Sequence, residues 1–159
     1  MVPNAFRMLA NGPAALQGYL GLRGALSHGT LDETMQRRIA LAVSEINGSE
    51  YCVAGNTYLA RMGKPDDAEI TAYRNGASND PYADAAVRFA AKIARARGHV
   101  SDDDVRAAKA AGYTDAQVVE ITAVVAMSTL ANYVNEVTGT DIDFPRIARQ
   151  AKAALTPVS

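Results

Sequence analysis

Apolar residues recur along this chain at helical spacing. Between residues 32 and 46, Ile39 and Ala40 are followed by Val43 and Ile46 at steps of three or four residues, which places all four on one side of an α-helix. No segment alternates apolar and polar residues over the length of a strand, and no tight-turn pair joins two runs rich in β-branched residues. The pattern therefore predicts an all-α fold.

Caps and breakers divide this pattern into successive helices. Ser101 is a good N-cap, Thr114 and Gln117 match a capping box, and Asn47-Gly48 can end a helix in the left-handed conformation. We expect one domain over residues 1–159, with residues 1–10 as an arm and 146–159 as a C-terminal helix and tail. The predicted helices cover residues 14–27, 32–46, 49–62, 65–75, 82–97, 101–112, 114–137 and 146–155.

The predicted helices differ in how much polar surface they carry. The helix over residues 114–137 is the most apolar, so we place it at the centre of the core. The capped helices between residues 65 and 112 are candidates for a lid or a contact between subunits. His28 and His99, the only histidines, follow predicted helix ends, where a histidine usually lies at the surface and complements the helix dipole.

Composition narrows the classes of function. Sixteen basic and seventeen acidic side chains nearly cancel, so we expect no nucleic-acid or membrane partner. A single cysteine rules out a disulfide within the chain and fits a reducing compartment. The first residues lack the features of a signal peptide, and no apolar run approaches the length of a membrane span. We therefore expect a cytoplasmic protein.

The single cysteine, Cys52, is the first candidate for chemistry. It falls in the opening turn of the predicted helix over residues 49–62, where free backbone N–H groups and the helix dipole favour an anion such as a thiolate. A free cysteine is more often a small buried hydrophobic residue. From position alone, both interpretations stay open.

The residues around Cys52 carry a family resemblance. Glu45, Ser49, Cys52 and Asn56 fall on the frame E-x(3)-C-x-x-C-x(3)-H. The chain thereby resembles the AhpD-like alkylhydroperoxidases of the carboxymuconolactone decarboxylase family. Residues 39–48 are similar to the lead-in helix of that family, and residues 124–145 to its closing segment. The likeness covers about residues 31–145.

The resemblance implies both a fold and an activity. It implies a single-domain AhpD-like helical fold that assembles into a homo-oligomer, as a dimer, trimer or hexamer. It further implies a thiol-dependent peroxidase whose partners are a small-molecule hydroperoxide and a thiol reductant, such as a lipoyl group or a small dithiol. No metal, haem or flavin is implied, so we expect no cofactor.

Two motif positions depart from the family. Ser49 stands where the first cysteine belongs, and Asn56 stands where the histidine belongs. A hydroxyl cannot close a disulfide with Cys52, and an amide cannot shuttle protons near neutral pH. The resemblance assigns Cys52 as the reactive thiol and Glu45 as its base. A carboxylate at a helix C-terminus meets the unfavourable end of the dipole, so Glu45 needs some further reason to be there.

Polar residues near the end of the helix over residues 114–137 are candidates for a substrate pocket. We place Asn132, Tyr133 and Asn135 there, together with Tyr51; equally, Tyr133 could pack in the core with its hydroxyl satisfied. Two other functions stay open. One is the acid–base chemistry of the decarboxylase branch, which would want a histidine in the pocket. The other is binding of a small molecule without turnover.

Overall fold

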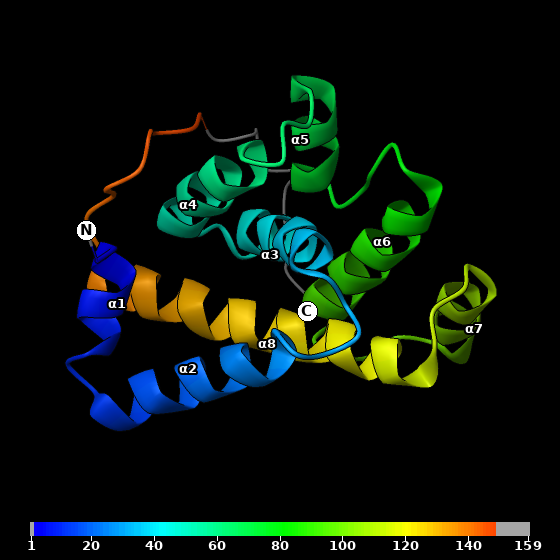
Figure 1. Ribbon diagram of the computed structural model, residues 1–159, viewed down its shortest axis with the longest axis horizontal. Coiled ribbons are helices and arrows are strands. Elements are labelled where there is room, and N and C mark those ends of the chain that lie inside the picture. The colour runs from blue at the N-terminus through cyan, green and yellow to red at the C-terminus, as the bar shows by residue number, and fades with distance from the viewer. Residues whose placement is uncertain (1, 149–159) are drawn as a thin grey trace, which may run out of the picture.

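The described part of the chain, residues 2–148, folds entirely from helices (Figure 1). This computed structural model contains no strand within those residues, which confirms the all-α prediction. Its helices are α1 (Asn4–Leu9), α2 (Pro13–Leu26), α3 (Glu33–Asn47), α4 (Glu50–Arg61), α5 (Asp67–Arg74), α6 (Pro81–Ala96), α7 (Asp102–Ala110) and α8 (Asp115–Thr138).

The helix boundaries follow from local chemistry, as the sequence predicts. Asp32 caps α3 by accepting a hydrogen bond from the Met35 amide at 2.7 Å, and complete capping boxes open α7 and α8. Gly48 ends α3 at φ 73°, a left-handed conformation that glycine adopts without strain. The chain therefore turns sharply between α3 and α4, immediately before the cysteine.

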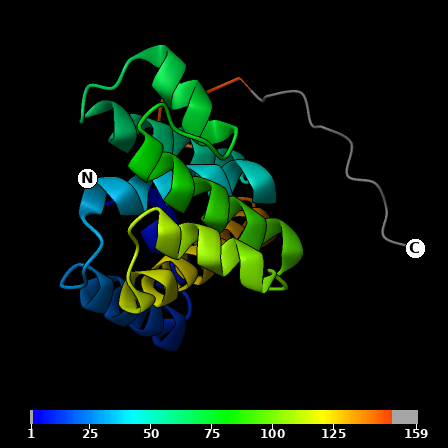
Figure 2. The same cartoon turned by 90° about the vertical axis from the view of Figure 1, so that its right-hand side faces the viewer.

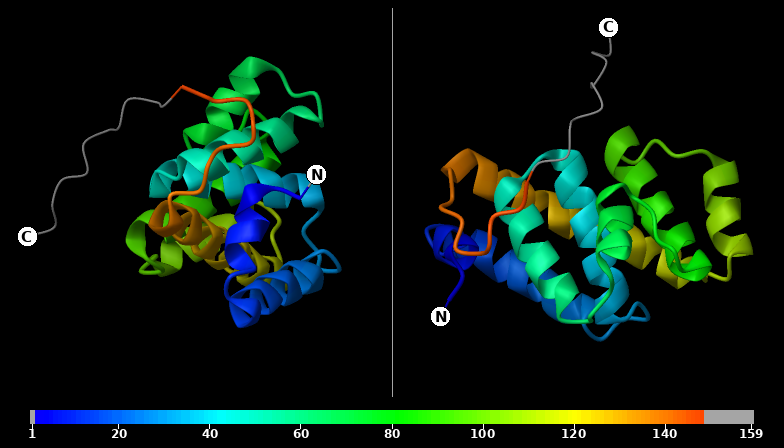
Figure 3. Two further views of the ribbon diagram at one scale, coloured as in Figure 1. Left: turned by 90° about the vertical axis from the view of Figure 1, so that its left-hand side faces the viewer. Right: turned by 90° about the horizontal axis from the view of Figure 1, so that it is seen from above.

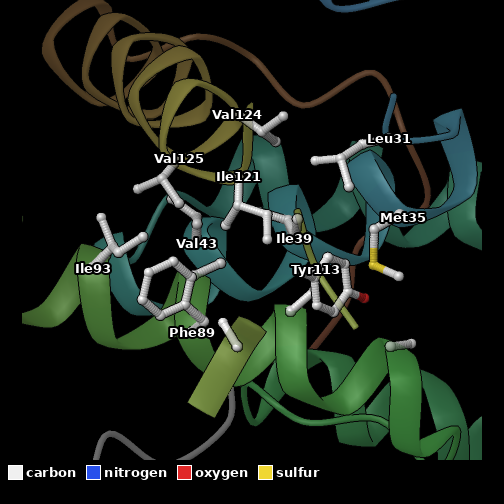
Figure 4. Packing of buried hydrophobic residues seen from close by; sticks show 14 of the residues in the cluster. Leu31, Met35, Ile39, Val43, Phe89, Ile93, Tyr113, Ile121, Val124 and Val125 are labelled. Atoms are coloured by element: carbon white, nitrogen blue, oxygen red, sulfur yellow. The ribbon is translucent and has the colours of Figure 1, made fainter. Parts of the chain in front are cut away.

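The main core lies where α3 packs against α6 and α8 (Figure 4). Ile39 and Val43 of α3 are fully buried and meet Phe89 of α6 and Ile121 of α8. Burying an apolar side chain of this size contributes about 1.5–3 kcal/mol. Helix α7 lies beside α6 and the first part of α8 (Figure 2). The core fixes α3 and α8 relative to each other, and both helices contribute to the site described below.

Helix α8 is central, as predicted, but only one of its faces is buried. Ile121 and Val124 are fully buried, whereas the opposite face carries an exposed apolar stripe. Among the described residues, α8 alone is long and apolar enough to cross a membrane by length and composition, although the core helix of a water-soluble protein can meet the same criterion. By this criterion the prediction that no apolar run approaches the length of a membrane span is wrong for α8. The exposed stripe consists of Val119, Thr122, Ala126, Leu130, Tyr133 and Val137.

Helix α1 and the segment 139–148 come together beside α4, and Figure 3 shows the course of both segments. The Asn4 backbone amide donates to Asp143 Oδ2 at 2.9 Å, and the Tyr51 hydroxyl donates to Asp143 Oδ1 at 2.8 Å. The same hydroxyl accepts a hydrogen bond from the Ala5 amide at 3.1 Å. We call these three hydrogen bonds the terminal latch, because they tie α1 and the segment 139–148 to α4.

Two expectations for the architecture need correction. The predicted helix over residues 146–155 is not present at residues 146–148, and its remainder lies outside the described residues. The helices between residues 65 and 112 do not form a lid over the cavity described below, because none of their residues lines it. Instead α6 packs into the core beside α3, since its apolar face, centred on Ala86 and Ala90, is fully buried.

Candidate functional site

A cavity of about 460 Å³ lies between α1, α2, α3, α4, α8 and the segment 139–148. Pockets of 300–1,000 Å³ commonly hold small molecules. Most of the lining is apolar or aromatic, with polar groups from α3, α4 and α8 and two arginines. The lining residues are Pro3, Ala5, Phe6, Leu9, Tyr19, Arg23, Glu33, Gln36, Arg37, Ala40, Tyr51, Cys52, Gly55, Asn56, Tyr58, Leu59, Met127, Ser128, Ala131, Asn132, Asn135 and Phe144.

Cys52 lines this cavity from the first turn of α4. It is the third residue of the helix and is 8% exposed. The Asn135 side chain, from α8, donates from Nδ2 to Cys52 Sγ at 3.3 Å. The sulfur therefore meets positive partial charge both from the start of α4 and from the Asn135 amide. The lone thiol stands at the wall of a ligand-sized space.

Two tyrosines share the environment of Cys52. Burial raises the pKa of Tyr51 to about 12, against a lowering by the Ala5 amide and together with the hydrogen bond to Asp143. Burial also raises the pKa of Tyr19, an effect that Arg23 opposes and negative charge at Cys52 reinforces. Both phenols therefore stay protonated at neutral pH, so they can donate hydrogen bonds but cannot act as bases.

Asn56 belongs to a buried hydrogen-bond network centred on Ser44. Ser44 Oγ accepts from Asn56 Nδ2 at 3.0 Å and from Asn132 Nδ2 at 3.1 Å, and donates to the Ala40 carbonyl at 2.7 Å. Asn132 Oδ1 in turn accepts from Asn47 Nδ2 at 2.8 Å. The amide at position 56 therefore joins α4 to α3 and, through Ser44, to α8. It holds the wall of the cavity in place.

The structure brings most of the predicted site residues together. Cys52, Tyr51, Asn56 and Asn132 all line the cavity, and so does Asn135. Asn132 and Asn135 face inward because they lie on the buried side of α8. These residues come from two helices that are far apart in the sequence, and the packing of α4 and α8 against α3 makes them neighbours.

Glu45 is not part of this group. Its carboxylate pairs with Arg74 of α5, with Oε2 2.9 Å from Nε, and it does not line the cavity. Arg74 also donates to the Ala148 carbonyl at 2.8 Å. The positive charge of Arg74 offsets the unfavourable position of the Glu45 carboxylate at the negative end of the α3 dipole. The structure thus supplies a reason for Glu45 other than the expected role as base.

Ser49 and Tyr133 also lie outside the cavity lining. Ser49 occupies the N-cap position of α4, but its hydroxyl makes no capping hydrogen bond and has no partner among the described residues. It is fully buried. Tyr133 is 58% exposed, so it neither faces the cavity nor packs in the core. Successive helix residues differ by about 100°, which turns Tyr133 away from the inward-facing Asn132.

Several residues in and around the cavity lining were not among those predicted from the sequence. Ser44 and Ser128 are buried polar residues within apolar helices, and their spacing to Asn47 and Asn132 could have revealed them. Phe144 was included in the stretch similar to the closing segment of the family, but it was not predicted to belong to the site. Its ring packs against Tyr51 and Tyr58, with centroids 5.7 Å away in each case. Gly55 permits this packing, because a Cβ there would lie 3.1 Å from Phe144 Cε2.

The polar groups of the site do not resemble a metal centre. Within residues 2–148, no three His, Cys, Asp or Glu side chains come together in a way that could hold a metal ion. Glu33, the single carboxylate of the lining, forms an ion pair with Arg37 at 2.5 Å. The lining offers one thiol, three phenols, two guanidinium groups, one carboxylate and several amides.

The fold and the position of the thiol define a class of protein. The model of the carboxymuconolactone decarboxylase family matches residues 13–96, which is more than half of the chain. The chain therefore belongs to this family, and the resemblance found in the sequence is confirmed. No curated protein sequence matches the chain.

Solved structures extend the likeness beyond the matched residues. An alkylhydroperoxidase AhpD core, an uncharacterized peroxidase-related protein from Ralstonia eutropha JMP134, is 25% identical with a TM-score of 0.81, over 90% of this chain and 78% of that chain. A peroxidase-related protein from Silicibacter sp. TM1040 is 23% identical with a TM-score of 0.79, over 89% and 76%. A cysteine-to-alanine variant of the debrominase Bmp8, in complex with 2,3,4-tribromopyrrole, is 18% identical with a TM-score of 0.75, over 90% and 78%. The AhpD-like fold is thereby shown.

Proposed function

We propose that this protein reduces small organic hydroperoxides through Cys52 and depends on an external thiol for turnover. The observation that carries the proposal is the position of the sulfur. Cys52 lines an apolar cavity of about 460 Å³ from the first turn of α4, with the Asn135 amide donating to Sγ. A thiolate in such a place is the usual nucleophile of thiol peroxidases.

The reaction balances without a second cysteine in the chain. The thiolate attacks the terminal oxygen of R–O–O–H, so the O–O bond breaks, Cys52 becomes a sulfenic acid, and the alkoxide leaves and takes up a proton from solvent. An external thiol then displaces water to form a mixed disulfide. A second thiol releases Cys52 and leaves as the external disulfide. Each turnover consumes two thiols, because Ser49 cannot act as an internal partner.

The other polar residues near Cys52 are consistent with a reaction that needs no neighbouring base. Glu45 pairs with Arg74, and the Asn56 amide donates to Ser44 Oγ. In this scheme neither side chain serves as a base for Cys52. The amide of Asn135 is the group that contacts the sulfur directly. We therefore propose that hydrogen bonding, and not a neighbouring base, prepares Cys52 for reaction.

The proposal is tested by treating the reduced protein with cumene hydroperoxide in the presence of dimedone. We expect a dimedone adduct on Cys52 in the mass spectrum, formed faster than on glutathione under the same conditions. Cys52→Ser should form none. A rate no greater than that of free glutathione would refute the redox function and leave binding without turnover.

The structure offers less support for the acid–base alternative. A decarboxylase of this family would need a group that exchanges protons near neutral pH. The raised pKa values of Tyr19 and Tyr51 keep both protonated, and Glu33 is paired with Arg37. Neither histidine is among the lining residues.

A second candidate is reductive dehalogenation of a small aromatic ring. Two observations favour it: the aromatic lining of the cavity and the likeness in fold to a debrominase bound to tribromopyrrole. Overall, the aryl bromide and two thiols would give the reduced ring, a disulfide, bromide and a proton. Bromide release from 2,3,4-tribromopyrrole with dithiothreitol, measured for the wild type and Cys52→Ser, decides this candidate.

We further propose that the protein self-associates through α8. The exposed stripe presents Leu130, Tyr133 and Val137 to solvent, with Val137 86% exposed. A contiguous apolar face of this kind commonly marks a protein contact. Sedimentation velocity of the wild type and of Val137→Lys tests the proposal. A monomeric wild type, or an assembly that survives the lysine, would refute it.

A further inference from the structure

The buried face of α8 carries a row of polar residues. Ser128, Asn132 and Asn135 are spaced four and three residues apart, so they share one side of the helix. All three line the cavity and are at least nine-tenths buried. Both polar atoms of the Asn132 side chain have partners within the protein, because Nδ2 donates to Ser44 Oγ and Oδ1 accepts from Asn47 Nδ2. Ser128 and Asn135 each keep one oxygen atom without such a partner.

Two oxygen atoms in this row have no partner among the described residues, namely Ser128 Oγ and Asn135 Oδ1. The contrast within α8 is informative. The hydroxyls of Thr122 and Thr138 each donate to the carbonyl four residues earlier, at 3.0 and 2.8 Å. Ser128 makes no such bond. A buried polar atom without a partner costs free energy, and both residues belong to the lining of the cavity.

The orientation of the Asn135 amide is fixed by its neighbours. Its Nδ2 donates to the Ala131 carbonyl at 2.9 Å and to Cys52 Sγ at 3.3 Å. A carbonyl can only accept, so Nδ2 must be the atom on that side. Oδ1 is therefore left as an acceptor without a donor, in the same side chain that contacts the reactive sulfur.

We propose that Asn135 Oδ1, assisted by Ser128 Oγ, recognises a hydrogen-bond donor on the ligand. The cavity would then select neutral, ring-sized molecules that carry an O–H or N–H group over counterparts in which that hydrogen is a methyl group. Asn135 is a positioning residue in this scheme, because Nδ2 holds the sulfur while Oδ1 places the donor group of the ligand beside it. The inference rests on the proposed function only for the reaction at sulfur, since the selection is a property of binding.

The test compares 2-naphthol with 2-methoxynaphthalene, in which a methyl group replaces the hydroxyl hydrogen. The chain contains no tryptophan, so naphthalene fluorescence can be followed against a low protein background. We expect the wild type to bind 2-naphthol roughly tenfold more tightly, as one buried hydrogen bond implies. Asn135→Leu should bring the two affinities close together. Thr122→Val, which removes a hydroxyl of α8 outside the cavity, should keep the preference.

Control variants separate recognition from folding. Ser128→Ala is a milder change and should reduce the preference for 2-naphthol even if Asn135→Leu fails to fold. Asn135→Asp keeps an acceptor but places negative charge beside the sulfur. It should therefore retain the preference, while the pH profile of Cys52 alkylation by iodoacetamide moves to higher pH. Tyr19 of α2 and Tyr51 of α4 interact electrostatically with Cys52, Asn135 of α8 donates to its sulfur, and Arg23 of α2 is a charged residue of the same lining.

Three results would overturn the inference: equal affinities for the two naphthalenes in the wild type, no binding of either, or a preference that survives Asn135→Leu and Ser128→Ala. The outcome is independent of the dimedone experiment. A protein that prefers 2-naphthol but forms no dimedone adduct supports the recognition and refutes the redox function. Dimedone labelling without any preference for 2-naphthol does the reverse.

Discussion

Removing the Tyr51 hydroxyl should open the terminal latch without disturbing the core. Tyr51 is 5% exposed, and its hydroxyl both accepts from the Ala5 amide and donates to Asp143. In Tyr51→Phe the ring can keep its edge contact with Phe144, but both hydrogen bonds are lost. We expect a cost of about 1–2 kcal/mol for closure of the latch, since the Ala5 amide also loses its acceptor.

Hydrogen exchange measures this cost where it arises. A loss of 1.4 kcal/mol raises an opening equilibrium about tenfold, so the amides of α1 should exchange about tenfold faster in Tyr51→Phe. Amides in the buried part of α6 should exchange at the wild-type rate, because opening of a terminal segment is a local event. Asp143→Asn in both backgrounds closes a double-mutant cycle, and the coupling should be on the order of 1 kcal/mol. Equal acceleration in α1 and α6, or none in α1, would refute this account of the latch.

Three further predictions concern other features of the structure. Burial raises the pKa of Asp143, but hydrogen bonds from Tyr51 and the Asn4 amide outweigh it and lower that pKa. Protection of the α1 amides from hydrogen exchange should therefore be complete above the unfolded-state pKa of about 4 and should fall as the pH drops through the folded-state pKa. In Asp143→Asn this pH dependence should vanish. Gly55→Ala should lower the urea midpoint of unfolding, because the added Cβ crowds Phe144. Gly18→Ala adds a Cβ into open space and should raise the free energy of unfolding by about 1 kcal/mol. A higher urea midpoint for Gly55→Ala than for Gly18→Ala would contradict the packing described. Glu45→Gln should lower the thermal midpoint by weakening the pair with Arg74 but leave dimedone labelling of Cys52 unchanged, and a large loss of labelling would restore Glu45 as the base.

The helices could be read from the sequence because their boundaries depend on neighbouring residues. Asp32, Ser101 and Thr114 cap helices through bonds to amides three residues ahead, and Gly48 ends α3 by its own conformation. These signals lie within a few positions of the boundary they set. The packing of α6 into the core was missed, because its position depends on which faces meet in three dimensions.

The site was only partly predictable, for the same reason. The motif frame pointed to Cys52 and Asn56, which both line the cavity. The position of the Glu45 carboxylate depends on Arg74, which lies 29 residues away. The group at residues 132–135 was treated as one polar patch. Helical rotation divides it, turning Asn132 and Asn135 inward and Tyr133 to solvent. Counting 100° per residue along α8 would have separated them.

The terminal latch has a practical bearing on how this protein is handled. Pro3, Ala5 and Phe6 contribute to the wall of the cavity, and the Asn4 amide is held by Asp143. A purification tag fused directly ahead of Pro3 would emerge beside the compartment that an assay is meant to probe. Cleaving such a tag before ligand titrations, or comparing cleaved and uncleaved protein, would reveal any artefact arising from this neighbourhood.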